Sequence, residues 1–271
     1  MITEPNVVEI SAPITICSSI QGHFFDLLEI FKIAENPPNS NYLFLGNNVN
    51  NGFYSLECIT LLLCLKVRYP KRIFLMRGKY DDKTISFNYG FYDECLTKYG
   101  NSKVYNYVVD VFNYFPLCAK IENQIFCVNS GLSHEINTID EINSLERIKE
   151  IPEEGPITDL LYNEPGDNFY GFSYTKGFGC LFFGYEITRN FNETNKCKYM
   201  IIGPKLYSYE GYEWLQDNQL CSIFSASNFC NRYRNKGAVM IIDEYLENKI
   251  LQFYSPKEKY DNNKRIPDYF F

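Results

Sequence analysis

Short apolar runs alternate with longer helix-like stretches over the first eighty residues. The runs at 14–17, 42–45 and 73–76 have the length and composition of buried strands. Between them, apolar residues recur at helical spacing over 24–31, and 56–67 is almost entirely apolar. Strands that alternate with helices pair in parallel through right-handed crossovers. The apolar character of 56–67 predicts a helix that is sandwiched between two layers.

The second half of the chain has more closely spaced strands. The runs 117–121 and 125–128 flank three polar residues and predict a hairpin. Later apolar runs predict further strands, antiparallel because of their close spacing, and 163–175 is typical of a surface loop; these strands are 199–202, 220–224, 238–242 and 250–254. We therefore expect an α/β fold, a sandwich of two mixed β-sheets flanked by helices, as one domain over 1–254 with a tail over 255–271.

Charge and cysteine usage narrow the classes of function. A net charge of −7 and a pI near 5.1, with scattered basic residues, argue against a nucleic-acid partner. Ten cysteines without a Cys-x-x-Cys pair, several in apolar runs such as Cys58 and Cys64, indicate buried thiols in a reducing compartment. There is no signal-peptide pattern, and the longest apolar run is far shorter than the roughly 20 residues of a membrane span. We expect a cytoplasmic and/or nuclear protein without a membrane partner.

The loops that follow the strands lack the residues that an enzyme of this architecture presents. Ligands of open α/β sheets bind beyond the carboxyl ends of the strands. Those positions hold Ser19, Asn47, Lys79, Asn129 and Lys205. Acids and histidines, the usual groups of hydrolytic chemistry, are absent from these five positions.

Four collinear segments carry a specific resemblance. Gly-Phe-Tyr-Asp-Glu-Cys-Leu-Thr-Lys-Tyr-Gly (90–100), Leu-Lys-Val-Arg-Tyr-Pro (65–70), Glu-Gly-Pro-Ile-Thr-Asp-Leu-Leu (154–161) and the closing Pro-Asp-Tyr-Phe-Phe resemble the catalytic subunit of protein serine/threonine phosphatase type 2A. That member of the phosphoprotein phosphatase family is a two-metal hydrolase. The resemblance implies a metallophosphatase-like fold whose single domain is N-terminally short. It also implies protein partners, namely a helical-repeat scaffold or a regulatory subunit of a phosphatase assembly.

The resemblance also identifies the residues at the family's functional positions. Tyr80 stands at the position of the catalytic acid histidine, and Asn51 and Gly203 stand at those of the phosphate-binding arginines. The positions that match metal ligands are Ser19, Gln21, Asn47, Lys79, Asn129 and Lys205. Neutral amides and hydroxyls bind divalent cations poorly. We therefore expect no metal and no cofactor, and a pseudophosphatase: an inactive homologue that acts as a binding or regulatory subunit.

Two other functions remain open. Lys79 and Lys205, with Arg232, could form an anion pocket that reads phosphate or a phosphopeptide, although the same lysines could pair with Asp81 or Asp82 or simply face solvent. The other alternative is a protein serine/threonine phosphatase with residual or altered activity. In addition, the resemblance makes the C-terminal residues a partner-binding tail; these are Pro267, Asp268, Tyr269, Phe270 and Phe271.

Several single residues have structural interpretations. His23 is expected to be a partly exposed polar residue, and His134 has no assigned role. The pair Asp81-Asp82 is expected to stabilise a helix N-terminus. Arg77 is expected to make a structural pair, and Cys17 and Cys127 are expected in the core.

Overall fold

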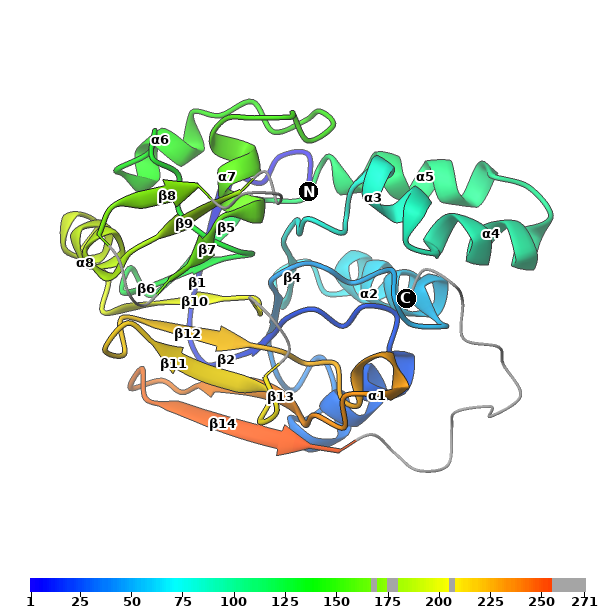
Figure 1. Cartoon of the computed structure of the whole chain (residues 1–271). Coiled ribbons are helices and arrows are strands. Elements are labelled where there is room, and N and C mark those ends of the chain that lie inside the picture. Colours follow the sequence, from blue (N-terminus) through cyan, green and yellow to red (C-terminus); the bar gives the residue numbers. More distant parts are fainter. Residues whose placement is uncertain (167–169, 175–179, 205–207, 255–271) are drawn as a thin grey trace.

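Two β-sheets packed face to face form the centre of the molecule (Figure 1). The computed structural model describes residues 1–166, 170–174, 180–204 and 208–254. The first sheet has the order β1-β5-β6-β10-β12-β11, with β1 Val7–Ile10, β5 Cys118–Ile121, β6 Ile125–Val128, β10 Tyr199–Ile202, β12 Leu220–Ile223 and β11 Tyr212–Leu215. The second has the order β14-β13-β2-β3-β4, with β14 Asn248–Phe253, β13 Gly237–Ile242, β2 Ile14–Cys17, β3 Tyr42–Phe44 and β4 Ile73–Leu75.

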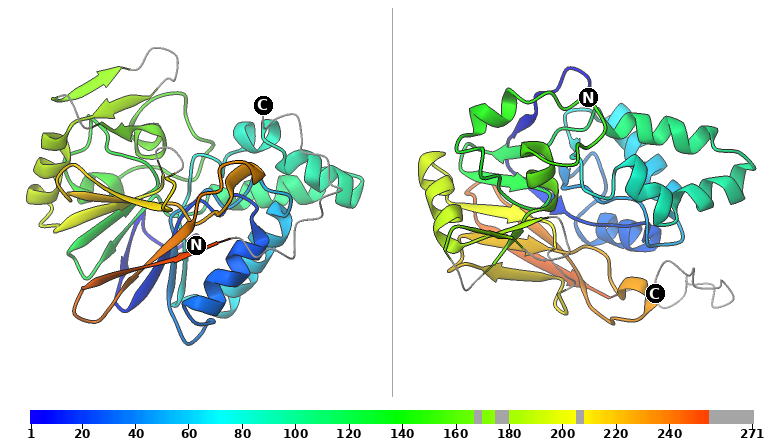
Figure 2. Two further views of the ribbon diagram at one scale, coloured as in Figure 1. Left: turned by 60° about the horizontal axis from the view of Figure 1, so that its bottom comes forward. Right: turned by 45° about the horizontal axis from the view of Figure 1, so that its top comes forward.

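Helices cover the outer faces of both sheets. The views in Figure 2 place α1 to α5 on one side of the paired sheets and α8 on the opposite side. The helices are α1 Phe24–Ile33, α2 Ser55–Arg68, α3 Lys83–Asn88, α4 Phe91–Tyr99, α5 Lys103–Phe112, α6 Ile139–Asn143, α7 Pro156–Tyr162 and α8 Tyr185–Thr194, with a 3₁₀ turn, η1, at Phe229–Asn231. A small sheet has the order β7-β9-β8, with β7 Glu164–Pro165, β9 Leu181–Phe183 and β8 Phe172–Tyr174.

Three apolar clusters account for this layering. Ile16 and Leu43 of the second sheet meet Ile121 and Ile201 of the first sheet in the central cluster. The opposite face of the second sheet packs on α1, α2, α4 and α5, and the outer face of the first sheet packs on α6, α7 and α8. Strands buried on both faces carry continuous apolar runs, and all four residues of β2 are buried. The expected sandwich of two mixed sheets flanked by helices is confirmed.

The second-sheet strands and the hairpin match their sequence patterns, but two features differ. β10 is parallel to both β6 and β12, so the expected antiparallel pairing there is wrong. The close spacing of these strands reflects β11, which pairs antiparallel with β12 and was not anticipated. The expected loop over 163–175 contains β7 and β8 in its described part.

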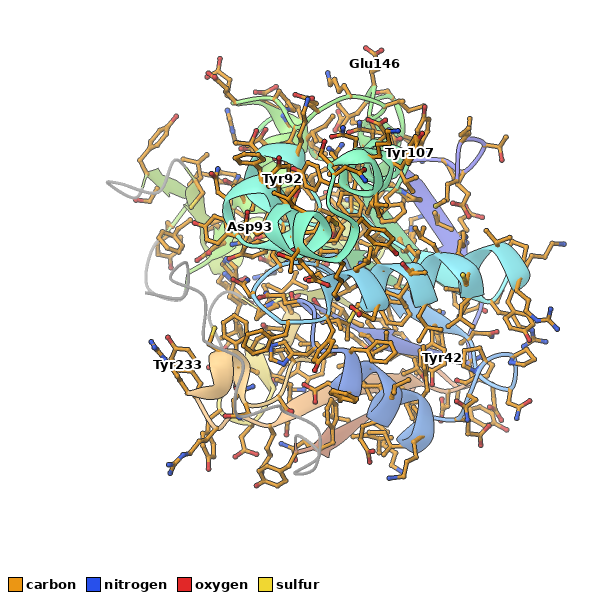
Figure 3. The ribbon with its side chains drawn as sticks, turned by 90° about the vertical axis from the view of Figure 1, so that its right-hand side faces the viewer. Tyr42, Tyr92, Asp93, Tyr107, Glu146 and Tyr233 are labelled. Atoms are coloured by element: carbon orange, nitrogen blue, oxygen red, sulfur yellow. The ribbon has the colours of Figure 1, made fainter. Side chains whose placement is uncertain are left out.

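Helix α2 is covered on one face only. Leu62 is fully buried, but Val67 is 80 % exposed and Cys64 is also exposed, so neither the sandwiched helix nor a buried Cys64 is correct. Beyond α2, helices α3, α4 and α5 form an arm that projects from the body (Figure 1). Figure 3 looks onto this side and shows α4, with Tyr92 and Asp93, and α5, with Tyr107, above α2, while α1 lies below α2.

The two adjacent leucines of α1 provide a matched test of this packing. Leu27 is fully buried, whereas Leu28 is 37 % exposed. We expect Leu27→Ala to lower the free energy of unfolding by about 3 kcal/mol, because it removes buried methyl groups and leaves a cavity. Leu28→Ala should change it by less than about 0.5–1 kcal/mol. Chemical denaturation of both variants measures the difference, and equal losses would contradict the assigned face of α1.

Candidate functional site

The loops that leave the carboxyl ends of β3, β4 and β6 converge on Gly78. A Cβ atom at this position would lie 2.4 Å from the backbone nitrogen of Asn47 and 2.8 Å from Nδ2 of Asn129. No residue with a side chain fits there without displacing backbone. Glycine at this position therefore allows close contact between the loops that hold most of the predicted site residues.

Asn47 and Asn129 link these loops through both ends of their amides. Asn47 Nδ2 donates to Ser19 Oγ at 3.2 Å, and its Oδ1 accepts from the backbone N–H of Tyr80 at 3.0 Å. Asn129 Nδ2 donates to the carbonyl of Leu45 at 2.8 Å, and its Oδ1 accepts from the N–H of Lys79 at 3.2 Å. Because Asn129 follows a strand of the first sheet and Leu45 one of the second, this amide connects the two sheets.

A second chain of contacts lies next to these amides. Asn51 Nδ2 donates to Gln21 Oε1 at 2.7 Å, and the Asn51 side chain also hydrogen-bonds the Tyr80 hydroxyl. Burial raises the pKa of Tyr80, and the contact with Asn51 opposes that rise. The structure thus brings together the predicted positions Ser19, Gln21, Asn47, Asn51 and Tyr80.

Asp81 is the only carboxylate that holds these loops within the described ranges. Its Oδ2 accepts from the N–H groups of Asn47 at 2.7 Å and Gly78 at 3.0 Å, and its Oδ1 accepts from Asn48 N at 3.1 Å. Burial raises the pKa of Asp81 to about 6, and the three backbone donors oppose that rise. Of the expected helix-terminal pair, only Asp82 caps a helix: it accepts from Thr84 N and Ile85 N at the start of α3.

The backbone of these loops is unusual as well. Ser19, Gln21, Asn47 and Asn51 all have left-handed conformations, with φ between 47° and 58°. Asparagine tolerates this region better than serine or glutamine does, and each strained residue costs roughly 1–3 kcal/mol. Such conformations persist only where the surrounding contacts fix them, and here the amide hydrogen bonds do so.

Beside these loops lies a pocket of about 260 Å³ between α3, the end of α7 and β9. Three tyrosines line it, with Lys79 and Glu164 as charged groups; the lining residues are Lys79, Tyr80, Ile85, Tyr89, Tyr162, Glu164 and Cys180. The Lys79 ammonium lies 5.7 Å from the centre of the Tyr80 ring. In the parts of the chain that the structure describes, it makes no ion pair with Asp81 or Asp82, so that alternative is not found for Lys79.

Sequence reasoning missed this pocket. Tyr89 directly follows α3, and Tyr162 is the last residue of α7. No sequence motif marks either position as functional. Only their proximity in the folded chain brings them to Lys79. Burial raises the pKa of Tyr162 to about 12, so its hydroxyl stays protonated at neutral pH.

The other predicted residues have different places. Gly203 packs against the loop after β6: a Cβ there would lie 2.7 Å from the Asn129 carbonyl. Arg232 is exposed just after η1, and Arg77 is buried and donates to Asn113 Oδ1 and to the Lys149 carbonyl, a structural role as expected. Lys205 and the tail residues 267–271 lie outside the described residues. The helical-repeat partner therefore stays a prediction.

His23 is buried, so its expected partial exposure is wrong. Its Nδ1 lies 3.6 Å from Oδ2 of Asp26, which in turn accepts from Ser227 N at 2.7 Å and from Ser227 Oγ. This contact ties α1 to the loop before η1. Burial lowers the pKa of His23 to about 4 and raises that of Asp26 to about 7, the latter against the hydrogen bonds from Ser227.

The two-metal centre that the resemblance implies does not fit these residues. The described residues contain no group of three or more His, Cys, Asp or Glu side chains that could hold a metal ion. At the matched positions, the amide oxygens of Asn47, Asn129 and Gln21 already accept hydrogen bonds. Divalent cations need anionic oxygen or imidazole ligands, and this donor set offers neither.

Comparison with known proteins identifies relatives of this arrangement. The family described as calcineurin-like phosphoesterase matches residues 12–203. A protein serine/threonine phosphatase from Saccharomyces cerevisiae, with similarity to human phosphatase PP5, superposes with a TM-score of 0.88 at 27 % identity, over 94 % of this chain and 86 % of that one. A cold-active protein-tyrosine phosphatase of a psychrophilic Shewanella shares the fold, with a TM-score of 0.61 at 13 % identity over 91 % and 84 % of the chains.

These findings contradict the expectation that the chain is not an enzyme. The matching family and the yeast structure are phosphoesterases, and the fold is that of such enzymes over almost the whole chain. The changed residues alone were the ground for inactivity, and no positive observation supports it.

The helices of the described residues were also compared with the length and apolar character of a membrane span, and none of them meets both requirements.

The buried pair His23 and Asp26 predicts a specific pH dependence. In the unfolded state, at any pH between the ordinary pKa values of 3.8 and 6.5, the two side chains together hold one proton, which is on His23. In the folded state they also hold one proton between about pH 4 and about pH 7, but it is on Asp26. Their contributions to stability therefore oppose each other and nearly cancel from pH 4 to 6.5: the raised Asp26 pKa removes stability as pH rises, and the lowered His23 pKa adds it.

Asp26→Asn should remove this cancellation. Only His23 then titrates, and the unfolded state binds its proton more readily, so stability should rise with pH between 4 and 6.5. The extra slope should approach 1.4 kcal/mol per pH unit, the value for one proton. Denaturation of both proteins across this range measures it, and parallel pH profiles would contradict the buried pair.

Proposed function

This chain belongs to the calcineurin-like phosphoesterase family, and we propose that it binds phosphorylated segments of partner proteins beside its cleft, as a regulatory member of that family. The observation that carries the proposal is the position of Lys79. Its ammonium borders an aromatic pocket of about 260 Å³ and makes no ion pair in the described parts of the chain. A half-buried lysine at the edge of a pocket can make a charge-assisted hydrogen bond to a phosphate group.

The pocket suggests how such a segment lies. A phosphoryl group meets Lys79, and an apolar or aromatic neighbour in the peptide packs against Tyr80, Tyr89 and Tyr162. The proposed ligand is therefore a phosphorylated peptide with an apolar residue next to the phosphoryl group.

Calorimetric titration with a phosphoserine peptide of this composition tests the proposal. We expect Lys79→Ala to weaken binding about tenfold, because it removes one charge-assisted contact. Lys71→Ala is the matched control: Lys71 is exposed in the turn between α2 and β4 and should leave the affinity unchanged.

The unphosphorylated peptide completes the experiment. Equal affinity for the two peptides, or equal losses in the Lys79 and Lys71 variants, would refute the proposal. Inorganic phosphate released during the titration is measured in the same samples. Its release would add turnover to binding, since a phosphoesterase must bind the same class of ligand before it reacts.

A further inference from the structure

The residues at the positions of the implied metal centre do not fit metal ions, but their hydrogen bonds connect the loops of the cleft. The side chains of Asn47 and Asn129 bridge the loops after β2, β3, β4 and β6. In a two-metal centre, ions shared between loops perform that task. We infer that these two amides, with Asp81, form an ion-free clasp that holds the cleft in its folded geometry without any divalent cation.

The polarity of each amide supports the clasp. Asn129 is only 2 % exposed, and its two ends face opposite partners: Nδ2 meets the Leu45 carbonyl at 2.8 Å, and Oδ1 meets the Lys79 N–H at 3.2 Å. A carboxylate could satisfy only the second contact. The position is therefore built for a neutral amide and against the anionic ligand that a cation requires.

The charged groups around the clasp also disfavour a bound cation. Asp81 is fully buried and directs its oxygens at three backbone N–H groups, so its carboxylate is already engaged within the clasp. The backbone of Lys79 is part of the clasp, and its ammonium adds positive charge to the same loop. A cation would have to break these hydrogen bonds before it could bind.

The clasp is independent of the proposed peptide ligand, so thermal denaturation and metal analysis test it without a peptide-binding measurement. The melting temperature of the purified protein should be the same in EDTA and in millimolar Mn²⁺ or Zn²⁺. Elemental analysis should find far less than one metal ion per chain. A saturable rise of the melting temperature with Mn²⁺, or a stoichiometric metal content, would overturn the clasp.

Asn129→Asp tests the clasp directly. It places a carboxylate oxygen against the Leu45 carbonyl, and we expect the melting temperature to fall by at least about 4 °C. Mn²⁺ should not restore it. Asn106→Asp is the matched control, since Asn106 is exposed on α5 and the same charge there should have little effect. Recovery of Asn129→Asp by Mn²⁺ would refute the inference, and if this variant fails to fold, the wild-type metal titration still decides.

Discussion

The cleft depends on one buried carboxylate and the backbone it holds. Asp81 accepts hydrogen bonds from Asn47, Asn48 and Gly78, and these three N–H groups belong to two loops that meet where glycine alone fits. Removing a charge from water is costly, and three charge-assisted contacts offset that cost. Without the carboxylate, three buried donors would lack partners, and the loops that carry the amides would lose their register.

Layers of apolar packing make that register possible. The central cluster fixes β2, β3 and β4 relative to β6 and β10, so the loops at their carboxyl ends start from rigid positions. Helix α1 extends the same rigidity to the loop before η1, because Asp26 binds Ser227 across two hundred residues of sequence. The left-handed residues of the cleft are tolerable because these anchors over-determine their backbone.

The local pattern of the sequence predicts most of this frame and little of the cleft's chemistry. The mainly apolar run at 14–17 correctly predicts the bounds of β2, because a strand buried on both faces carries few polar residues. The pairing of β10 and the exposure of Val67 depend on neighbours far along the chain, and the spacing of residues does not encode them. The same holds for His23 and the tyrosine pocket, whose members meet only after folding. Ser19, Asn47, Lys79 and Asn129 do follow strand ends as predicted, but the spacing of residues did not reveal their hydrogen bonds.

The hydrogen bonds that close the cleft also decide where it can recognise a ligand. The side-chain polar atoms of Asn47, Asn129 and Asp81 are hydrogen-bonded to Ser19 and to backbone groups, so these three residues offer few donors to a ligand. The Lys79 ammonium lies at the rim, beside the pocket that Tyr80, Tyr89 and Tyr162 line. Under the proposed function, recognition therefore occurs at the pocket and not at the centre of the loops. A substitution at the centre should then change mainly the folding of the cleft, whereas one at the rim should change which ligand binds.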